Sequence, residues 1–263
     1  MNIVVLVKQV PDTSAERTLT EGEYGHITLD RESLDPVLDE INERAVEEAL
    51  RLKETTGAHV TVVTMGPAPA ADALRKALAM GADAGIHVCD EALLGSDVPT
   101  TARVLAAAVR TVEDVDLVLA GNAATDGRAG AVPAAVADLL GLPQLTQVRE
   151  LKIGDGQVRA ERVTEDGEET LQAPLPSLVS VTEKINEPRY PSFKGIMAAK
   201  KKPIRTLDLD ELFPAAGSQS FVTARSQVVQ AVPRPPRAAG TRINDDGSAG
   251  TQIAENLMAQ KLL

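Results

Sequence analysis

Five short, mostly apolar runs constrain the fold of this chain more than any other feature of its sequence. They cover Ile3–Val10, His59–Met65, Ile86–Cys89, Asp116–Ala120 and Leu178–Thr182. A strand buried on one face alternates apolar and polar residues, whereas a strand buried on both faces is apolar throughout. The five runs are of the second kind. They therefore predict strands of a parallel sheet that is covered on both faces.

Segments with helical spacing separate the strand runs up to residue 141. They cover Asp39–Glu54, Asp72–Met80, Thr100–Val112 and Ala129–Leu140. Gly81 and Gly141 follow two of them, as expected where a helix ends. Alternating strands and helices predict an α/β fold with right-handed crossovers. The expected architecture is a Rossmann-like parallel sheet with helices on both faces.

The pattern changes after residue 143. Val158–Val163 and Glu169–Gln172 flank an Asp-Gly pair, which predicts an added β-hairpin at about 157–172. From Pro214 onward, Pro, Gly, Ser and Ala predominate, as in an extended linker. Helical spacing returns at Ile253–Leu262, and so short a helix needs another surface, on this chain or on a partner, with the partner favoured. We therefore expect an α/β nucleotide-binding domain at 1–213 and an extended C-terminal arm at 214–263.

Residues 186–203 combine rare aromatic side chains with a basic run. The whole chain has two tyrosines, three phenylalanines and no tryptophan, and Tyr190 and Phe193 both lie here. Pro188 and Pro191 favour extended or turn conformations around them. Either Phe193 folds back into its own domain, or it is an exposed apolar anchor beside a positive patch, as in a docking site.

The net charge of −11 argues against general nucleic-acid binding. Lys194, Lys200–Lys202 and Arg205 nevertheless form a basic island, which is either a solvated helix face or a surface that steers an acidic partner. The single cysteine, Cys89, excludes an internal disulfide and fits a reducing compartment. No membrane-spanning or targeting run is visible, so we expect a cytoplasmic location and no membrane insertion.

No common catalytic or metal-binding motif is present in the sequence. His26, His59 and His87 are scattered, and the last two are expected at strand starts with structural roles. We therefore expect no metal site and no catalytic residues. The sequence points away from an ordinary enzyme.

Two strand ends have the composition of a nucleotide-binding edge. In open α/β sheets, ligands bind beyond the carboxyl ends of the strands. These ends are Met65–Pro67 and Gly121–Gly130, and the second holds three glycines and leads into a helix. Backbone N–H groups in such a loop can approach a phosphate, with Arg128 as a further partner. The alternative is a glycine-rich turn whose aspartate caps the following helix.

Taken together, the motifs resemble the beta subunit of electron-transfer flavoproteins over essentially the whole chain. The resemblance rests on Val7–Asp12, Ala45–Glu54, Gly66–Pro67, Ala77–Asp83, Arg162–Leu171 and Asn186–Lys202. It implies a heterodimer in which the alpha subunit holds most of the FAD, while beta shields the flavin and binds AMP structurally. Such carriers take electrons from acyl-CoA or other dehydrogenases, as in fatty acid beta-oxidation, and pass them to a quinone oxidoreductase.

The resemblance also implies site residues. The AMP or cofactor site corresponds to Leu6, Asp39, Glu40, Ile41, Asn42, Met65, Gly66, Asp126, Gly127, Arg128, Ala129, Gly130, Ala131 and Val132. The partner-docking residues correspond to Tyr190, Phe193, Ile196, Met197, Lys200, Lys201 and Lys202.

This chain departs from the family pattern in three places. Phe193 stands where leucine is common, Asp39–Ile41 replaces Asn-Pro-Phe, and Ala131–Pro133 replaces Gln-x-Gly. Electron-bifurcating members hold a second FAD at the AMP position, but their Gln-Val-Gly-Pro run is missing here, which favours AMP. The remaining alternatives are a stand-alone AMP- or ATP-binding α/β protein and a purely structural chain.

Overall fold

The computed structural model describes residues 1–15, 18–21, 27–31, 33–214, 224–226, 228–232, 235–236 and 240–262. His26 and parts of the expected linker lie outside these residues. Internal contacts divide the chain into two compact units, Met1–Val229 and Gln230–Leu263. The predicted boundary at residue 213 stays a prediction.

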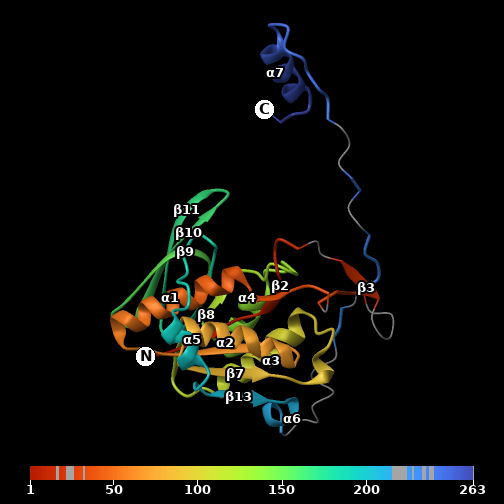
Figure 1. Cartoon of the computed structure of the whole chain (residues 1–263). Helices are drawn as coiled ribbons and strands as arrows, with labels where there is room; N and C mark the ends of the chain where they lie inside the picture. Colours follow the sequence, from red (N-terminus) through yellow and green to blue (C-terminus); the bar gives the residue numbers. More distant parts are fainter. Residues whose placement is uncertain are drawn as a thin grey trace. The chain divides into compact units, whose positions relative to one another are not determined.

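The first unit is built on a nine-stranded sheet with the order β11-β10-β9-β12-β8-β1-β6-β7-β13 (Figure 1). Its strands are β1 (Asn2–Leu6), β6 (His59–Met65), β7 (Ala84–Val88), β8 (Val115–Gly121), β9 (Gln144–Gly154), β10 (Gln157–Thr164), β11 (Gly167–Pro174), β12 (Ser177–Val181) and β13 (Ile204–Leu207). From β9 through β12 to β13 every neighbouring pair is parallel. Only the β9–β10 and β10–β11 pairs are antiparallel. The α/β prediction is confirmed.

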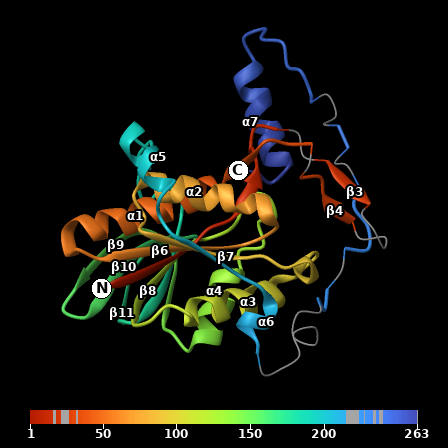
Figure 2. The same ribbon diagram turned by 60° about the horizontal axis from the view of Figure 1, so that its bottom comes forward.

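Helices cover both faces of the sheet (Figure 2). They are α1 (Glu40–Thr56), α2 (Ala71–Met80), α3 (Val98–Arg110), α4 (Val132–Leu140), α5 (Phe193–Ala199) and α6 (Leu209–Leu212). Residues of α1 and α2 share one apolar core with Ile3 and Val5 of β1, whereas residues of α3 and α4 share another with Val4 and Leu6. Alternate residues of one strand thus enter opposite cores, which is why the strand runs are apolar throughout.

The described part of the first unit also contains short elements. They are the small sheets β2 (Gln9–Pro11) with β5 (Pro36–Leu38) and β3 (Leu19–Glu21) with β4 (Ile27–Leu29), and the 3₁₀ turns η2 (Ala68–Ala70) and η3 (Glu91–Leu93). The expected first strand, Ile3–Val10, was therefore too long. Its ladder on the main sheet ends at Leu6, and the chain turns away so that Gln9–Pro11 pairs with β5.

The hairpin prediction is confirmed, since β10 and β11 pair antiparallel. The turn itself is Glu165-Asp166, one residue earlier than the expected Asp-Gly pair, and Gly167 already belongs to β11. The neighbouring strand β9 was missed. It pairs antiparallel with β10 and parallel with β12, and so joins the hairpin to the parallel part of the sheet.

Two helix ends follow the predicted glycine stops. Gly81 and Gly141 are the C-caps of α2 and α4. Helix α4 begins at Val132, later than expected, because Arg128 and Gly130 have φ angles of +49° and +66°. Positive φ is incompatible with a right-handed helix, so the loop extends to residue 131.

Within its described residues, the second unit contains one helix, α7 (Ala249–Ala259), and no residue of this helix is buried. It begins and ends earlier than the expected Ile253–Leu262. None of the helices in the described ranges has the length and apolar character needed to cross a lipid bilayer.

Leu74 tests the core beneath α2. Its side chain is fully buried between α2 and the sheet. We expect Leu74→Ala to lower the free energy of unfolding by about 2–5 kcal/mol, because it removes buried methyl groups and leaves a cavity. Urea unfolding measures the loss. The control Leu94→Ala, at a side chain that is 87% exposed, should change it by less than about 0.5 kcal/mol. Equal losses for the two variants would contradict this description of the core.

Candidate functional site

The carboxylate of Asp39 connects the start of α1 to the loop after β8. Its Oδ1 accepts hydrogen bonds from the backbone N–H groups of Ile41 (3.0 Å) and Asn42 (3.2 Å) and so caps the helix. Its Oδ2 accepts from both the backbone N–H and the hydroxyl of Thr125, each at 2.7 Å. Asp39 is fully buried. Two predicted parts of the site, residues 39–42 and the loop at 126–132, are therefore held together.

Asp126 lies beside two cations at the same edge of the sheet. Lys8 Nζ and Arg31 Nη2 lie 2.8 and 2.6 Å from its carboxylate, whose side chain is 1% exposed. Burial raises the pKa of Asp126, but Lys8 and Arg31 outweigh it and hold that pKa below its ordinary value. Asp126 thus forms ion pairs with Lys8 and Arg31 and does not cap α4. Among the described residues, no side chain caps the first turn of this helix. The helix-capping alternative is wrong.

Lys8 and Arg31 were not predicted as site residues. Lys8 also donates its backbone N–H to Asn42 Oδ1 at 2.8 Å, so the chain after β1 is fixed to the first turn of α1. The side chains of Lys8 and Arg31 remain 41% and 44% exposed. Two half-exposed cations thus share one buried carboxylate at this edge. The signal in the sequence was a lysine within the apolar run Ile3–Val10, at the position where the strand β1 has just ended.

The loop at 127–131 is exposed and precedes α4. The N–H of Gly127 donates to Asp126 Oδ1 at 2.7 Å, and the N–H of Arg128 donates to Ala124 O at 2.9 Å. The unpaired N–H groups at the start of a helix give it positive potential, so the loop leads toward an anion-attracting end. Gly121, at the end of β8, packs so closely on α1 that a Cβ there would lie 2.5 Å from Asn42 Nδ2.

The remaining predicted residues lie at the ends of β1 and β6. Leu6 is buried and Met65 half-buried. His87 is not at a strand start as expected: it lies within β7, is buried, and its Nε2 is 2.9 Å from Gly66 O. That contact supports the expected structural role. The structure thus brings the predicted nucleotide residues to one edge of β1, β6 and β8.

The predicted docking residues form a second surface. Tyr190 is 95% exposed and Phe193 is 81% exposed, while Ile196 and Met197 are about half exposed. Phe193 does not fold back into its own domain, and that alternative is wrong. The helix here starts at Phe193, because the hydroxyl of Ser192 accepts a hydrogen bond from the backbone N–H of Gly195 at 3.0 Å and so caps it.

Lys200 and Lys201 are exposed, but Lys202 has a different position. Its Nζ donates to Leu78 O (2.9 Å) and Ala82 O (2.5 Å), at the C-terminal end of α2. Burial lowers its pKa. The predicted docking role of Lys202 therefore does not match its geometry, since its ammonium group caps a helix within the domain.

Comparison with known proteins identifies the family. Residues 27–212 match the electron transfer flavoprotein domain. The chain belongs to the electron-transfer flavoprotein family. It is 52% identical to proteins named electron transfer flavoprotein subunit beta from Mycobacterium bovis and Mycobacterium leprae, across all of this chain and 99% of theirs. It is 35% identical, over 99% of its length and 97% of the relative's, to the caffeyl-CoA reductase-Etf complex subunit CarD of Acetobacterium woodii.

The family resemblance drawn from the sequence motifs is thereby confirmed, and it places the chain in electron transfer. The predicted nucleotide residues lie at the edge of β1, β6 and β8, which we name the nucleotide edge. The matched region contains most of this edge and all of the predicted docking residues. Leu6 and Lys8 lie before it.

The pH dependence of stability tests the Asp126 cluster. A carboxylate whose pKa is lowered by folding contributes stability above its unfolded pKa of about 3.9, and the contribution is lost as pH falls through the folded pKa. We expect Asp126→Asn to destabilise the protein by about 1–3 kcal/mol at pH 7, with the difference from wild type shrinking below about pH 4. Urea unfolding between pH 7 and 3 measures it. Asp138→Asn, at an exposed position of α4, should follow the wild-type curve. If the difference in unfolding free energy between wild type and Asp126→Asn stays constant with pH, the ion pairs of Asp126 are not the cause of the lost stability.

Proposed function

We propose that the chain is the beta subunit of a heterodimeric electron-transfer flavoprotein. It shields an FAD held mainly by the alpha subunit, binds AMP structurally and docks acyl-CoA or other dehydrogenases. Electrons then pass through the flavin to a respiratory quinone oxidoreductase, as in fatty acid beta-oxidation in the cytoplasm. The observation that carries the proposal is the 52% identity, over the whole chain, to proteins named as this subunit.

The edge of β1, β6 and β8 supports the AMP part. Lys8 and Arg31 supply positive charge, and the exposed loop at 127–131 leads to the first N–H groups of α4. A nucleotide phosphate requires this combination of charge and donors. We assign the phosphate to the loop and the cations, and the nucleoside to the neighbourhood of Leu6, Ile41 and Met65.

The surface of Tyr190, Phe193, Ile196 and Met197 supports the docking part. Large exposed apolar side chains grouped beside the exposed Lys200 are typical of a protein–protein contact. Helix α7 supports assembly in a similar way, because a short helix with no buried residue requires a further surface. We assign that surface to the alpha subunit.

We further propose that the subunit is an electron carrier without catalytic residues of its own. The flavin supplies the redox chemistry, and the chain orients and shields it. Among the described residues, no group of three or more His, Cys, Asp or Glu side chains is arranged to hold a metal ion.

A second FAD at the AMP position is the alternative. FAD contains an adenylate, so the same cations and loop suit either ligand. The 35% identity to a subunit of a caffeyl-CoA reductase-Etf complex supports this alternative. The ligand, and not the fold, distinguishes the two functions.

Nucleotide content decides between them. The chain is co-expressed with its alpha subunit, the complex is denatured, and the released nucleotides are separated and counted. We expect one FAD and one AMP per heterodimer. Two FAD would establish the alternative, and a protein with no FAD and no stable partner would refute the proposed function.

Phe193→Ala tests the docking surface. We expect electron transfer from an acyl-CoA dehydrogenase to slow about 10- to 100-fold at low concentrations of the flavoprotein, because a central apolar anchor is lost. FAD content should not change. Flavin reduction followed by absorbance measures the rate. Leu94→Ala, which removes an equally exposed apolar side chain elsewhere, should react as wild type. A wild-type rate for Phe193→Ala would exclude the anchor.

A further inference from the structure

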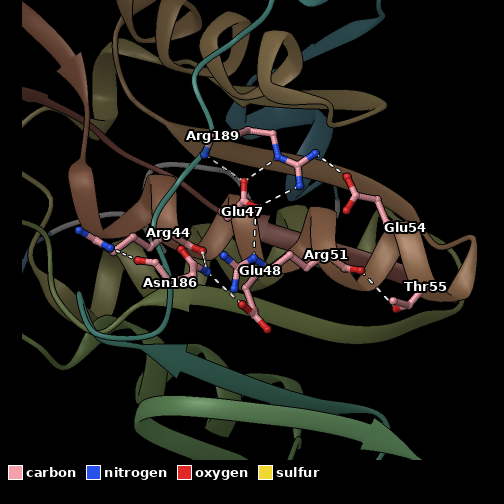
Figure 3. Close-up of polar contacts among 8 residues, drawn as sticks. All are labelled: Arg44, Glu47, Glu48, Arg51, Glu54, Thr55, Asn186 and Arg189. Carbon is pink, nitrogen blue, oxygen red and sulfur yellow. Dashed lines mark hydrogen bonds and ion pairs between the residues drawn. The ribbon is translucent and has the colours of Figure 1, made fainter.

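Arg189 attaches the chain before α5 to helix α1 through four hydrogen bonds (Figure 3). Its backbone N–H donates to Glu47 Oε2 at 3.2 Å. Its Nε and Nη2 donate to the two oxygens of Glu47 at 2.7 and 3.0 Å, and its Nη1 donates to Glu54 Oε1 at 2.5 Å. The fork-shaped pairing with Glu47 fixes the orientation of the guanidinium group as well as its position.

Glu47 is only 4% exposed, so its carboxylate requires hydrogen-bonding partners within the protein. Burial raises the pKa of Glu47, but the hydrogen bonds and charge of Arg189 outweigh it, and the pKa lies below its ordinary value. Arg51, one turn along α1, donates to Glu47 Oε1 at 3.2 Å as well. A buried carboxylate that loses its partner is costly, so Glu47 holds Arg189 in place.

Asn186 provides a second attachment to α1, three residues earlier in the chain. Its Nδ2 donates to Arg44 O and to Glu48 Oε2, each at 3.0 Å, and its backbone carbonyl oxygen accepts from the guanidinium of Arg44. Asn186 is 9% exposed. The approach to α5 is therefore fixed at two points before the exposed Tyr190.

The far end of α5 is fixed to α2. Arg75 Nη1 donates to Ala199 O (2.8 Å) and to Lys202 O (3.0 Å). Gly195 packs so closely on α2 that a Cβ there would overlap Ala79 O. Residues 190–197, which we name the docking segment, are thus held from both sides while their large apolar side chains remain exposed.

We propose that Arg189 is a positioning residue of the docking surface, which holds the docking segment in its binding conformation before the partner arrives. The inference rests on the proposed function. The partner it serves is a dehydrogenase that offers an apolar pocket with an acidic rim. The pocket suits Phe193 and its apolar neighbours, and the acidic rim suits the exposed Lys194, Lys200 and Lys201.

The physical reason is the ordering cost of binding. The side chains of Tyr190 and Phe193 are largely exposed and gain little from packing within their own domain. Without Arg189 the docking segment would sample other conformations, and the partner would have to order it at the cost of affinity. The Glu47 and Glu54 carboxylates hold Arg189, and with it the docking segment, so this cost is removed before binding. Arg189 can act in this way without touching the partner.

The test compares Arg189→Ala and Arg189→Lys in the heterodimer with FAD bound, using an acyl-CoA dehydrogenase and its acyl-CoA substrate as the electron donor. For Arg189→Ala we expect the KM for the flavoprotein to rise about tenfold with kcat within about twofold. Arg189→Lys keeps the positive charge but loses the two-point pairing with Glu47, so it should raise the KM by a smaller factor. If the alanine variant does not fold, the lysine variant provides the test. Hydrogen exchange at Gly195 and Ile196 should accelerate at least about fivefold, while exchange in α3 stays as in wild type.

Arg149→Ala is the matched control. Arg149 also pairs with two carboxylates, Glu161 and Glu168, at similar exposure but on β9, so its loss should leave the KM unchanged. An unchanged KM for both Arg189 variants, with or without faster exchange, would overturn the proposal. If Phe193→Ala raises the KM in the same assay, only the positioning role fails; if Phe193→Ala leaves it unchanged, the docking surface itself fails.

Discussion

The buried carboxylate of Asp39 is the interaction on which both surfaces of the first unit depend. It satisfies the first N–H groups of α1 and, through Thr125, fixes the loop after β8 against the same helix end. Capping a helix and joining two crossover loops are usually separate tasks. Here one side chain performs both, so the position of α1 and the shape of the nucleotide edge are determined together.

Helix α1 connects the nucleotide edge to the docking surface, so the position set by Asp39 affects both. Its first turn lies at the nucleotide edge. Glu47, about 12 Å along the axis from Asp39 at 1.5 Å per residue, receives the chain that leads to α5. Because a packed helix is rigid, the loop at 126–132 and the docking segment are positioned on one frame. A docked dehydrogenase would therefore be placed relative to the rest of the subunit without a flexible joint between them.

The sequence predicted the elements whose signal is local. Apolar runs such as His59–Met65 gave a strand with its true bounds, and Gly81 and Gly141 gave two helix ends. Strand β9 was missed because its buried residues, Leu145, Val148 and Leu151, recur every third residue and not in the strict alternation that marks a half-buried strand. The irregularity lies at Gln147, whose φ is +61° and where the register with β12 shifts. The polar contacts that shape both sites could not be predicted from the sequence either. Lys8 meets Asp126 across 118 residues and Arg189 meets Glu47 across 142, and no local pattern encodes such a pair.

Helix α5 inverts the usual arrangement of an amphipathic helix. Its small residues, Gly195 and Ala199, are one turn apart and face α2, while Phe193 and Met197, also one turn apart, face solvent. Only a small face allows the close approach to Ala79, so the large side chains have no place inside. Leaving Phe193 exposed forgoes about 1.5–3 kcal/mol of burial free energy that folding alone does not recover. Burial against another protein recovers it, and this is the physical argument for a docking role that the folded chain itself provides.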